Sequence, residues 1–180
     1  VGGSHKWLCG GPGAAFLYVH PRHLANGGLR PSITGWFGLQ TPFAYDPRTK
    51  DPELSDGVFR FLAGTPNVPA LYAAAEGNSI VETIGVEAIR EVSKELIAYL
   101  ETKASERSLL IRSPLNPTKR SGYLCIDFPG AKEICDELSK KHIITDYRPE
   151  CGIRVSPHFY NTKNDIDEFF SELDQQRSSH

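Results

Sequence analysis

The residue pattern of the sequence changes near Asn78, and this change limits the folds that the chain can adopt. Residues 1–79 are rich in glycine and proline, and the stretches 21–31, 35–38 and 45–57 carry turn-forming residues. One clear strand, at 16–19, follows a glycine turn at 10–13. Such a loop content is unusual for a self-sufficient domain. We therefore expect residues 1–79 to build a site rather than a core.

Residues 79–180 are regular by comparison. Apolar residues at near-helical spacing predict a long amphipathic helix over 79–104 and a second helix near 131–138. Strands are predicted at 108–112, 123–128, 143–147 and 152–156, and the loop between the first two indicates antiparallel pairing. Thr162, with Asp165 three residues later, resembles a capping box that opens a last helix. This half of the chain is therefore predicted to be a compact α+β unit.

Composition excludes several classes of partner. The chain of 180 residues has a net charge of −2 with both signs interspersed, so nothing indicates binding to nucleic acid or to an anionic membrane. Its apolar runs are too short to span a bilayer. The four cysteines lack Cys-x-x-Cys spacing, which disfavours a metal site or a disulfide framework and fits a reducing, cytoplasmic setting. Because the chain begins with Val1 and contains no methionine, we expect a fragment, a processed chain or one half of a split protein.

The functional signal lies in four separate segments. In chain order they are Gly3-Ser4-His5-Lys6-Trp7-Leu8-Cys9-Gly10-Gly11-Pro12-Gly13, Gly35-Trp36-Phe37-Gly38, the Gly64-Thr65-Pro66 turn, and Gly152-Ile153-Arg154-Val155-Ser156-Pro157. The first resembles the cofactor-lysine region of class V aminotransferase-fold enzymes that depend on pyridoxal 5'-phosphate (PLP), a group that includes kynureninases and cysteine desulfurases. The others resemble later segments of the same superfamily. Each segment alone is a weak signal, but four in the family's order make a strong resemblance.

This resemblance implies an α/β fold and a division of the chain. Residues 1–79 would be the end of the large domain of a fold type I PLP-transferase, residues 80–104 a connecting helix, and residues 105–180 a small α+β C-terminal domain. It also implies PLP as cofactor, an α-amino acid as substrate, and a homodimer with shared active sites. The family's pyridine-nitrogen carboxylate, ring-stacking aromatic and main phosphate loop lie upstream of the lysine. We therefore expect the partner of this chain to be a missing N-terminal half, without which the chain would be inactive.

Lys6 is the predicted catalytic residue. A lysine condenses with an aldehyde only when its amine is neutral, and burial or a nearby cation lowers the lysine pKa toward that state. Trp7 and Leu8, next to a glycine turn, are expected to supply such shelter. The resemblance implies that Lys6 holds PLP as a Schiff base and then moves protons as a general base and acid. It further implies that His5, Trp36 and Thr65 bind the cofactor, Thr65 at the site of the neighbouring subunit.

Arg154 is the predicted substrate-binding residue. Its planar guanidinium suits a two-pronged contact with the α-carboxylate of an amino acid. The alternation with Ile153 and Val155 places Arg154 on the opposite face of a strand from this apolar pair. Arg60 and Arg148 are predicted to be structural, and His158 either lines the site or packs against its neighbours.

The reaction itself stays open between an aminotransferase and a kynureninase-like hydrolase. Gly35-Trp36-Phe37-Gly38 favours kynureninases. Gly64-Thr65-Pro66 favours the aminotransferases and desulfurases, because the kynureninase segment at that turn resembles Asn-Pro-Pro instead. A desulfurase needs a mobile cysteine well upstream of the arginine. Cys151 lies in a tight turn only three residues before Arg154, and Cys9 is more plausibly a packing residue. A non-catalytic fragment that serves in dimerisation or binding is the alternative from another class.

Overall fold

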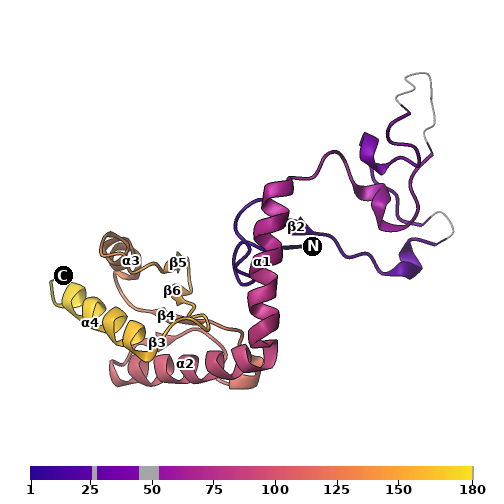
Figure 1. The fold of residues 1–180 in the computed structure, drawn as a ribbon. Helices are drawn as coiled ribbons and strands as arrows, with labels where there is room; N and C mark the ends of the chain where they lie inside the picture. The colour runs from indigo at the N-terminus through magenta and orange to yellow at the C-terminus, as the bar shows by residue number, and fades with distance from the viewer. Residues whose placement is uncertain (26–27, 45–52, 180) are drawn as a thin grey trace. The chain divides into compact units, whose positions relative to one another are not determined.

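The computed structural model describes residues 1–25, 28–44 and 53–179, and the chain divides into two compact units, Val1–Val81 and Glu82–His180. The predicted loops at 21–31 and 45–57 include residues 26–27 and 45–52, which lie outside the described residues. Figure 1 follows the chain through both units. The predicted domain boundaries at residues 79 and 104 stay predictions.

The first unit is loop-rich, with one long helix. Strands β1 (Gly2–Gly3) and β2 (Ala15–Phe16) pair in antiparallel fashion, and 3₁₀ turns follow at Pro21–His23, Trp36–Gly38 and Gly57–Phe61. Helix α1 (Val68–Ile84) closes the unit. Among the residues described in this unit, three alanines form the buried apolar cluster: Ala14, Ala70 and Ala74. So small a core supplies little hydrophobic stabilisation.

The sequence does not predict α1. Its buried positions are Ala70, Ala74, Gly77 and Val81, and the backbone approaches closely at Ala74 and Gly77, so the helix lacks the large apolar stripe that marks an amphipathic helix. The helix predicted over 79–104 is in fact interrupted at Gly85, where φ is +88°. Residues 79–84 complete α1, and α2 begins at Val86 and ends at Glu106. A positive φ is easy for glycine and ends the regular helical path there.

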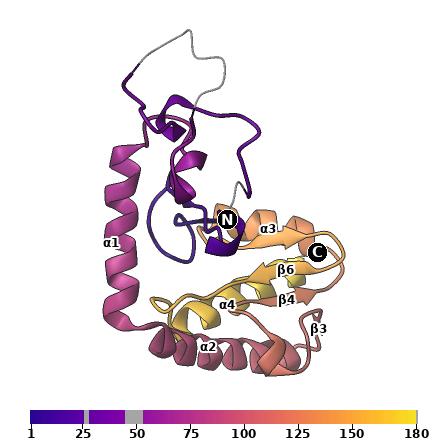
Figure 2. The ribbon, with the colours of Figure 1, turned by 90° about the vertical axis from the view of Figure 1, so that its right-hand side faces the viewer.

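The second unit is a four-stranded antiparallel sheet packed against helices (Figure 2). Its strands are β3 (Leu110–Ile111), β4 (Leu124–Asp127), β5 (Asp146–Arg148) and β6 (Gly152–Val155), in the order β3-β4-β6-β5. The predicted pairing of the first two strands is confirmed. Helices α2, α3 (Ala131–Lys140) and α4 (Lys163–Ser179) supply the other side of one continuous core. The predicted α+β unit is therefore correct.

The two faces of this sheet differ in character. Leu124, Ile126, Ile153 and Val155 point into the helix-covered core and are almost fully buried. The residues that alternate with them lie on the opposite, open face, because successive side chains of a strand point to opposite sides. The open face carries these polar or aromatic side chains: Arg112, Tyr123, Cys125, Asp127, Asp146, Arg148 and Arg154.

Helix α2 is tied to its surroundings by ion pairs. The guanidinium of Arg120, only 3% exposed, donates to both carboxylate oxygens of Glu101 at 2.5 and 2.8 Å. It also donates to the backbone carbonyls of Pro114 and Leu115, so one side chain anchors the loop between β3 and β4. Since this buried charge has partners on several sides, removing either Glu101 or Arg120 would leave a buried charge without its ion pair and destabilise the unit. The Arg120 hydrogen bonds hold the pKa of Glu101 below its ordinary value, against the opposing effect of burial.

Candidate active site

The Lys6 segment is a turn closed at both ends. The backbone N–H and the hydroxyl of buried Ser4 both donate to the carbonyl of Ala14 at 3.2 Å. The N–H of Gly10 donates to the carbonyl of Ser4 at 2.8 Å, and the N–H of Cys9 to that of Lys6 at 3.0 Å. Lys6 therefore lies on a loop whose backbone is fixed by hydrogen bonds rather than on a free tail.

Helix α1 is the support of this loop. A Cβ at Gly77 would lie 2.5 Å from the carbonyl oxygen of Leu8, and one at Gly10 would lie 2.9 Å from the Cα of Ala74. Both distances are too short for a Cβ atom, so the loop and the helix approach each other backbone to backbone. The small residues of α1 thus determine how closely the Lys6 loop can approach the helix.

The environment of the Lys6 amine differs from the expected one. His5, Lys6 and Trp7 are all exposed, and Leu8 is half-buried. Among the residues that the structure describes, no hydrogen bond or ion pair involves the Lys6 amine. The shelter expected from Trp7 and Leu8 does not cover the Lys6 side chain in this unit, which stays exposed.

The structure brings Trp36 and the Gly64-Thr65-Pro66 turn together. A Cβ at Gly35 would overlap the carbonyl of Ala63, at 1.6 Å from its oxygen, and one at Gly64 would lie 3.6 Å from the indole nitrogen of Trp36. The indole also meets the rings of Phe37 and Phe43, with centroids 4.5 and 5.4 Å away. Two segments that the sequence places about 30 residues apart are thus neighbours because two glycines permit the contact.

Thr65 and Leu8 of the Lys6 loop lie near different parts of α1. Thr65 is exposed and directly precedes α1, whose first turn Asn67 caps by accepting from the N–H of Ala70 at 3.3 Å. The Lys6 loop contacts the same helix near Gly77. At a rise of 1.5 Å per residue, the ten residues from Asn67 to Gly77 span about 15 Å.

Arg154 lies on the open face of the sheet, as predicted. Its neighbours Ile153 and Val155 are buried, whereas its own side chain is 35% exposed. The guanidinium donates to a carboxylate oxygen of Asp146 at 2.5 Å and lies over the ring of Tyr123, 5.5 Å from the centroid. An arginine held from two sides but still open to solvent can receive a carboxylate.

The remaining candidates, Arg60, His158 and Arg148, contact neighbouring groups of the protein. Arg60 donates to the carbonyl of Leu29, and its Nε is buried without a hydrogen-bond partner among the described residues. The His158 ring stacks on Tyr160, with centroids 5.1 Å apart. Arg148 joins the carboxylate of Asp146 at 2.8 Å.

Cysteine chemistry finds little support in this arrangement. Cys151 is exposed in the turn between β5 and β6, where its N–H donates to the carbonyl of Arg148. Cys125 is buried beside Arg154, and burial followed by proximity to Cys151 raises the pKa of its thiol. Across residues 1–25, 28–44 and 53–179, no group of His, Cys, Asp and Glu side chains is arranged to hold a metal ion.

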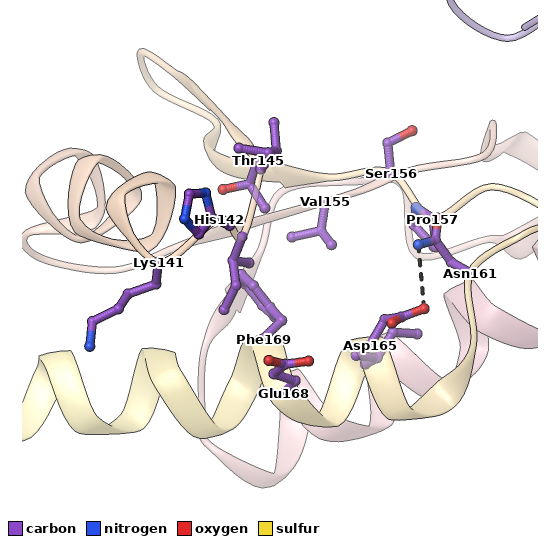
Figure 3. A pocket seen from close by; sticks show the side chains of 13 residues that line it. Lys141, His142, Thr145, Val155, Ser156, Pro157, Asn161, Asp165, Glu168 and Phe169 are labelled. Atoms are coloured by element: carbon purple, nitrogen blue, oxygen red, sulfur yellow. Dashed lines mark hydrogen bonds between the residues drawn. The ribbon is translucent and has the colours of Figure 1, made fainter.

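Sequence reasoning missed a pocket of about 320 Å³ in the second unit (Figure 3). Val155 and Phe169 are among its apolar lining residues, and His142, Asp165 and Glu168 are among its polar ones. It contains none of the five predicted site residues. The residues that line it come from three segments that are separated in the sequence, so no local pattern marks the pocket. No helix in the described part of the chain is long and apolar enough to cross a membrane.

Comparison with solved structures identifies the class of fold. The chain superposes on an apo cysteine desulfurase from Thermococcus onnurineus NA1 with a TM-score of 0.72 at 21% identity, covering 83% of this chain and 40% of that one. A cystine C-S lyase, C-DES, in complex with cysteine persulfide gives 0.76 at 19% identity, covering 95% and 44%. The chain therefore has the fold of the C-terminal region of fold type I PLP enzymes.

Sequence comparison then narrows the family. Residues 87–173 match the kynureninase C-terminal domain. The chain is 35% identical to an uncharacterized aminotransferase, YcbU, of Bacillus subtilis (strain 168) over 95% of its own length and 43% of that protein. It is 31% identical to a kynureninase of Geobacillus thermodenitrificans (strain NG80-2) over 86% of this chain and 36% of that protein. The chain is thus similar to the C-terminal part of proteins of the class V aminotransferase-fold superfamily. It spans about two-fifths of the length of these relatives.

Proposed function

We propose that this chain supplies the cofactor lysine and the carboxylate-binding arginine of a PLP-dependent enzyme that transforms an α-amino acid, of the class V aminotransferase type. The observation that carries the proposal is the Lys6 loop. Its exposed amine stands on a backbone fixed by Ser4, Ala14 and Gly10 and supported by α1. A covalent cofactor anchor needs a fixed backbone, and the shelter that keeps its amine neutral would come from the part of the relatives that this chain does not span. Lys6 would hold PLP as a Schiff base.

The residues of the first unit fit a phosphate-bearing cofactor. The Trp36 indole and the Thr65 hydroxyl offer neutral N–H and O–H donors, and Gly64 lets the backbone of the turn approach closely. His5, next to Lys6, adds a ring nitrogen for the same phosphate. The carboxylate and the aromatic ring that would hold the pyridine would come from the part of the relatives that this chain does not span.

Each proposed residue has a defined task. Bound PLP supplies an electron sink for the charge left at the substrate Cα. Lys6 would take and return the proton at that carbon, because its amine becomes free once the substrate amine has replaced it. Arg154 would bind the α-carboxylate in two-pronged fashion and so orient the bond that breaks.

The position of Thr65 favours a homodimer with shared sites. The resemblance places this turn at the cofactor of the neighbouring subunit, and the contact of Leu8 with Gly77 lies about 15 Å along α1 from Asn67, so the Thr65 turn of one subunit would complete the Lys6 site of the other. Complementation tests this arrangement. Complete enzymes that carry either Lys6→Ala or Thr65→Ala should each have impaired activity. Refolded together, they should regain about a quarter of the wild-type sites, since half the dimers are hybrids with one intact site each. Failure to regain activity would contradict shared sites.

The cofactor claim is tested on the complete enzyme that carries this chain. Added PLP should give the visible absorbance of a lysine-bound cofactor, resistant to dialysis after borohydride reduction. Lys6→Ala should abolish the covalent attachment, whereas the control Lys94→Ala, at an exposed position of α2, should not. An undiminished covalent band in Lys6→Ala would remove the proposal. Absence of any band in the wild type would favour the non-catalytic alternative, a domain for dimerisation or binding.

A kynureninase-like hydrolase is the second candidate. The match of residues 87–173 to the kynureninase C-terminal domain favours it, whereas the relative YcbU favours an aminotransferase. Incubating the complete enzyme with L-kynurenine and measuring anthranilate separates the two. Anthranilate without any need for a keto-acid acceptor supports the hydrolase. Amino transfer to a keto acid with no anthranilate supports the aminotransferase.

A further inference from the structure

We propose that Asp146 is a positioning residue that holds Arg154 ready for the substrate carboxylate. This inference rests on the proposed role of Arg154 and deepens it. Asp146 and Arg154 are direct cross-strand partners on β5 and β6. The aspartate oxygen lies 2.5 Å from a terminal nitrogen of the arginine and 2.8 Å from the Nε of Arg148. A single carboxylate thus joins two arginines on the open face of the sheet.

The charges around Arg154 favour an anionic ligand. Two guanidinium groups and one carboxylate leave one positive charge uncompensated at this cluster. The partner of Arg154 on its other side is Cys125, whose thiol stays neutral because burial raises its pKa. Tyr123, beneath the guanidinium, is uncharged at neutral pH. By contrast, Arg112 and Asp127 on the same face cancel each other.

The contact with Asp146 leaves the binding edge of Arg154 available. A guanidinium has five N–H groups, which form two edges with a parallel pair each. Asp146 receives one N–H from a terminal nitrogen, so one complete two-pronged edge remains. The side chain is 35% exposed, so a carboxylate can reach that edge.

Positioning is needed because Arg154 would otherwise sample many rotamers. An arginine loses considerable side-chain entropy when it is fixed, and that loss weakens binding if it occurs only when the substrate arrives. Asp146 on one side and the Tyr123 ring on the other fix the guanidinium beforehand. Asp146 therefore acts on substrate affinity through Arg154 and not on the reacting atoms.

The test compares two probes that differ only in the carboxylate. L-Alanine and ethylamine are titrated into the PLP-loaded complete enzyme, and binding is measured from the change in the visible absorbance of the cofactor. Asp146→Asn should weaken L-alanine binding by roughly tenfold, the lower end for losing a charge-assisted hydrogen bond at a partly exposed site. Ethylamine binding should stay within about twofold, because ethylamine makes no contact with Arg154. Asp146→Ala should weaken L-alanine binding further.

Asp127→Asn is the matched control. It removes the carboxylate of the Arg112 pair, also on the open face of the sheet, and should leave binding of both probes unchanged. Equal weakening of both probes by Asp146→Asn would mean a general structural loss, and tighter L-alanine binding would mean that Asp146 competes with the substrate. Either result overturns the positioning role, as does no effect. A wild-type enzyme without PLP absorbance would instead remove the proposed function, and this inference with it.

Discussion

Replacing Gly77 by alanine tests how α1 supports the Lys6 loop. In an ordinary helix this change stabilises by about 1 kcal/mol, because alanine loses less backbone entropy on folding than glycine. At this position the new Cβ would lie 2.5 Å from the Leu8 carbonyl oxygen, whereas ordinary contact begins at 3.4 Å. The loop backbone would have to withdraw by about 0.9 Å. Overpacking of this kind costs about 1–3 kcal/mol, so we expect a net loss of about 1 kcal/mol.

The functional effect of the change should exceed its effect on stability. A displacement of about 1 Å at a reacting group can lower a rate by about a hundredfold. We therefore expect Gly77→Ala to lower Tm by a few degrees and to reduce both covalent PLP attachment and activity of the complete enzyme strongly. Circular dichroism gives the Tm, and absorbance after borohydride reduction gives the attached cofactor.

Asn78→Ala serves as the control, since Asn78 is the next residue of α1 but is exposed. It should stabilise slightly, by about 0.5 kcal/mol, and leave PLP attachment unchanged. If Gly77→Ala also raised Tm and kept full PLP attachment, the proposed support of the loop by α1 would be wrong.

Three further predictions concern the ion pair of α2 and the Trp36 turn. Arg120→Ala should lower the free energy of unfolding, measured in urea, by about 2–3 kcal/mol. The loss should be smaller than for a fully buried ion pair, because the Glu101 side chain is about a third exposed. A loss below about 1 kcal/mol would contradict the anchoring role of Arg120. Because the pKa of Glu101 is lowered in the folded state, its contribution is complete above the unfolded-state pKa and is lost as the pH falls through the folded-state value. The urea midpoint of the wild type should therefore fall with acidification more steeply than that of Arg120→Ala, and parallel curves would refute the linkage. Gly35→Ala should disrupt the contact of Trp36 with Gly64, because its Cβ would overlap the Ala63 carbonyl; unchanged near-UV circular dichroism and Trp fluorescence would refute this.

Local signals in the sequence predicted the second unit well. Thr162 and Asp165 form the expected capping box, with the Thr162 N–H donating to the carboxylate at 2.7 Å and the Asp165 N–H pointing back to the hydroxyl at 3.4 Å. The alternation at Ile153, Arg154 and Val155 gave the correct face for each side chain. Both signals depend on residues close together in the chain, where local geometry decides the outcome.

Features that depend on distant contacts could not be predicted from the sequence. Helix α1 was not predicted because its buried face consists mainly of alanine and Gly77, which pack against backbone instead of presenting a large apolar stripe. The link between Asp146 and Arg154 depends on the register of β5 against β6, which the turn at Cys151 sets. The exposure of Lys6 was also unforeseen, because the residues beside it in sequence do not surround it in space.

The alternation along β6 makes this strand tolerant of one kind of change and intolerant of another. Replacing a residue on the solvent side leaves the hydrophobic side untouched, so ligand preference can drift during evolution without a loss of stability. Inserting or deleting one residue is different, since it would bury the Arg154 guanidinium and expel Ile153 and Val155 in a single step. Homologous chains should therefore vary in residue type along β6 while keeping its length constant.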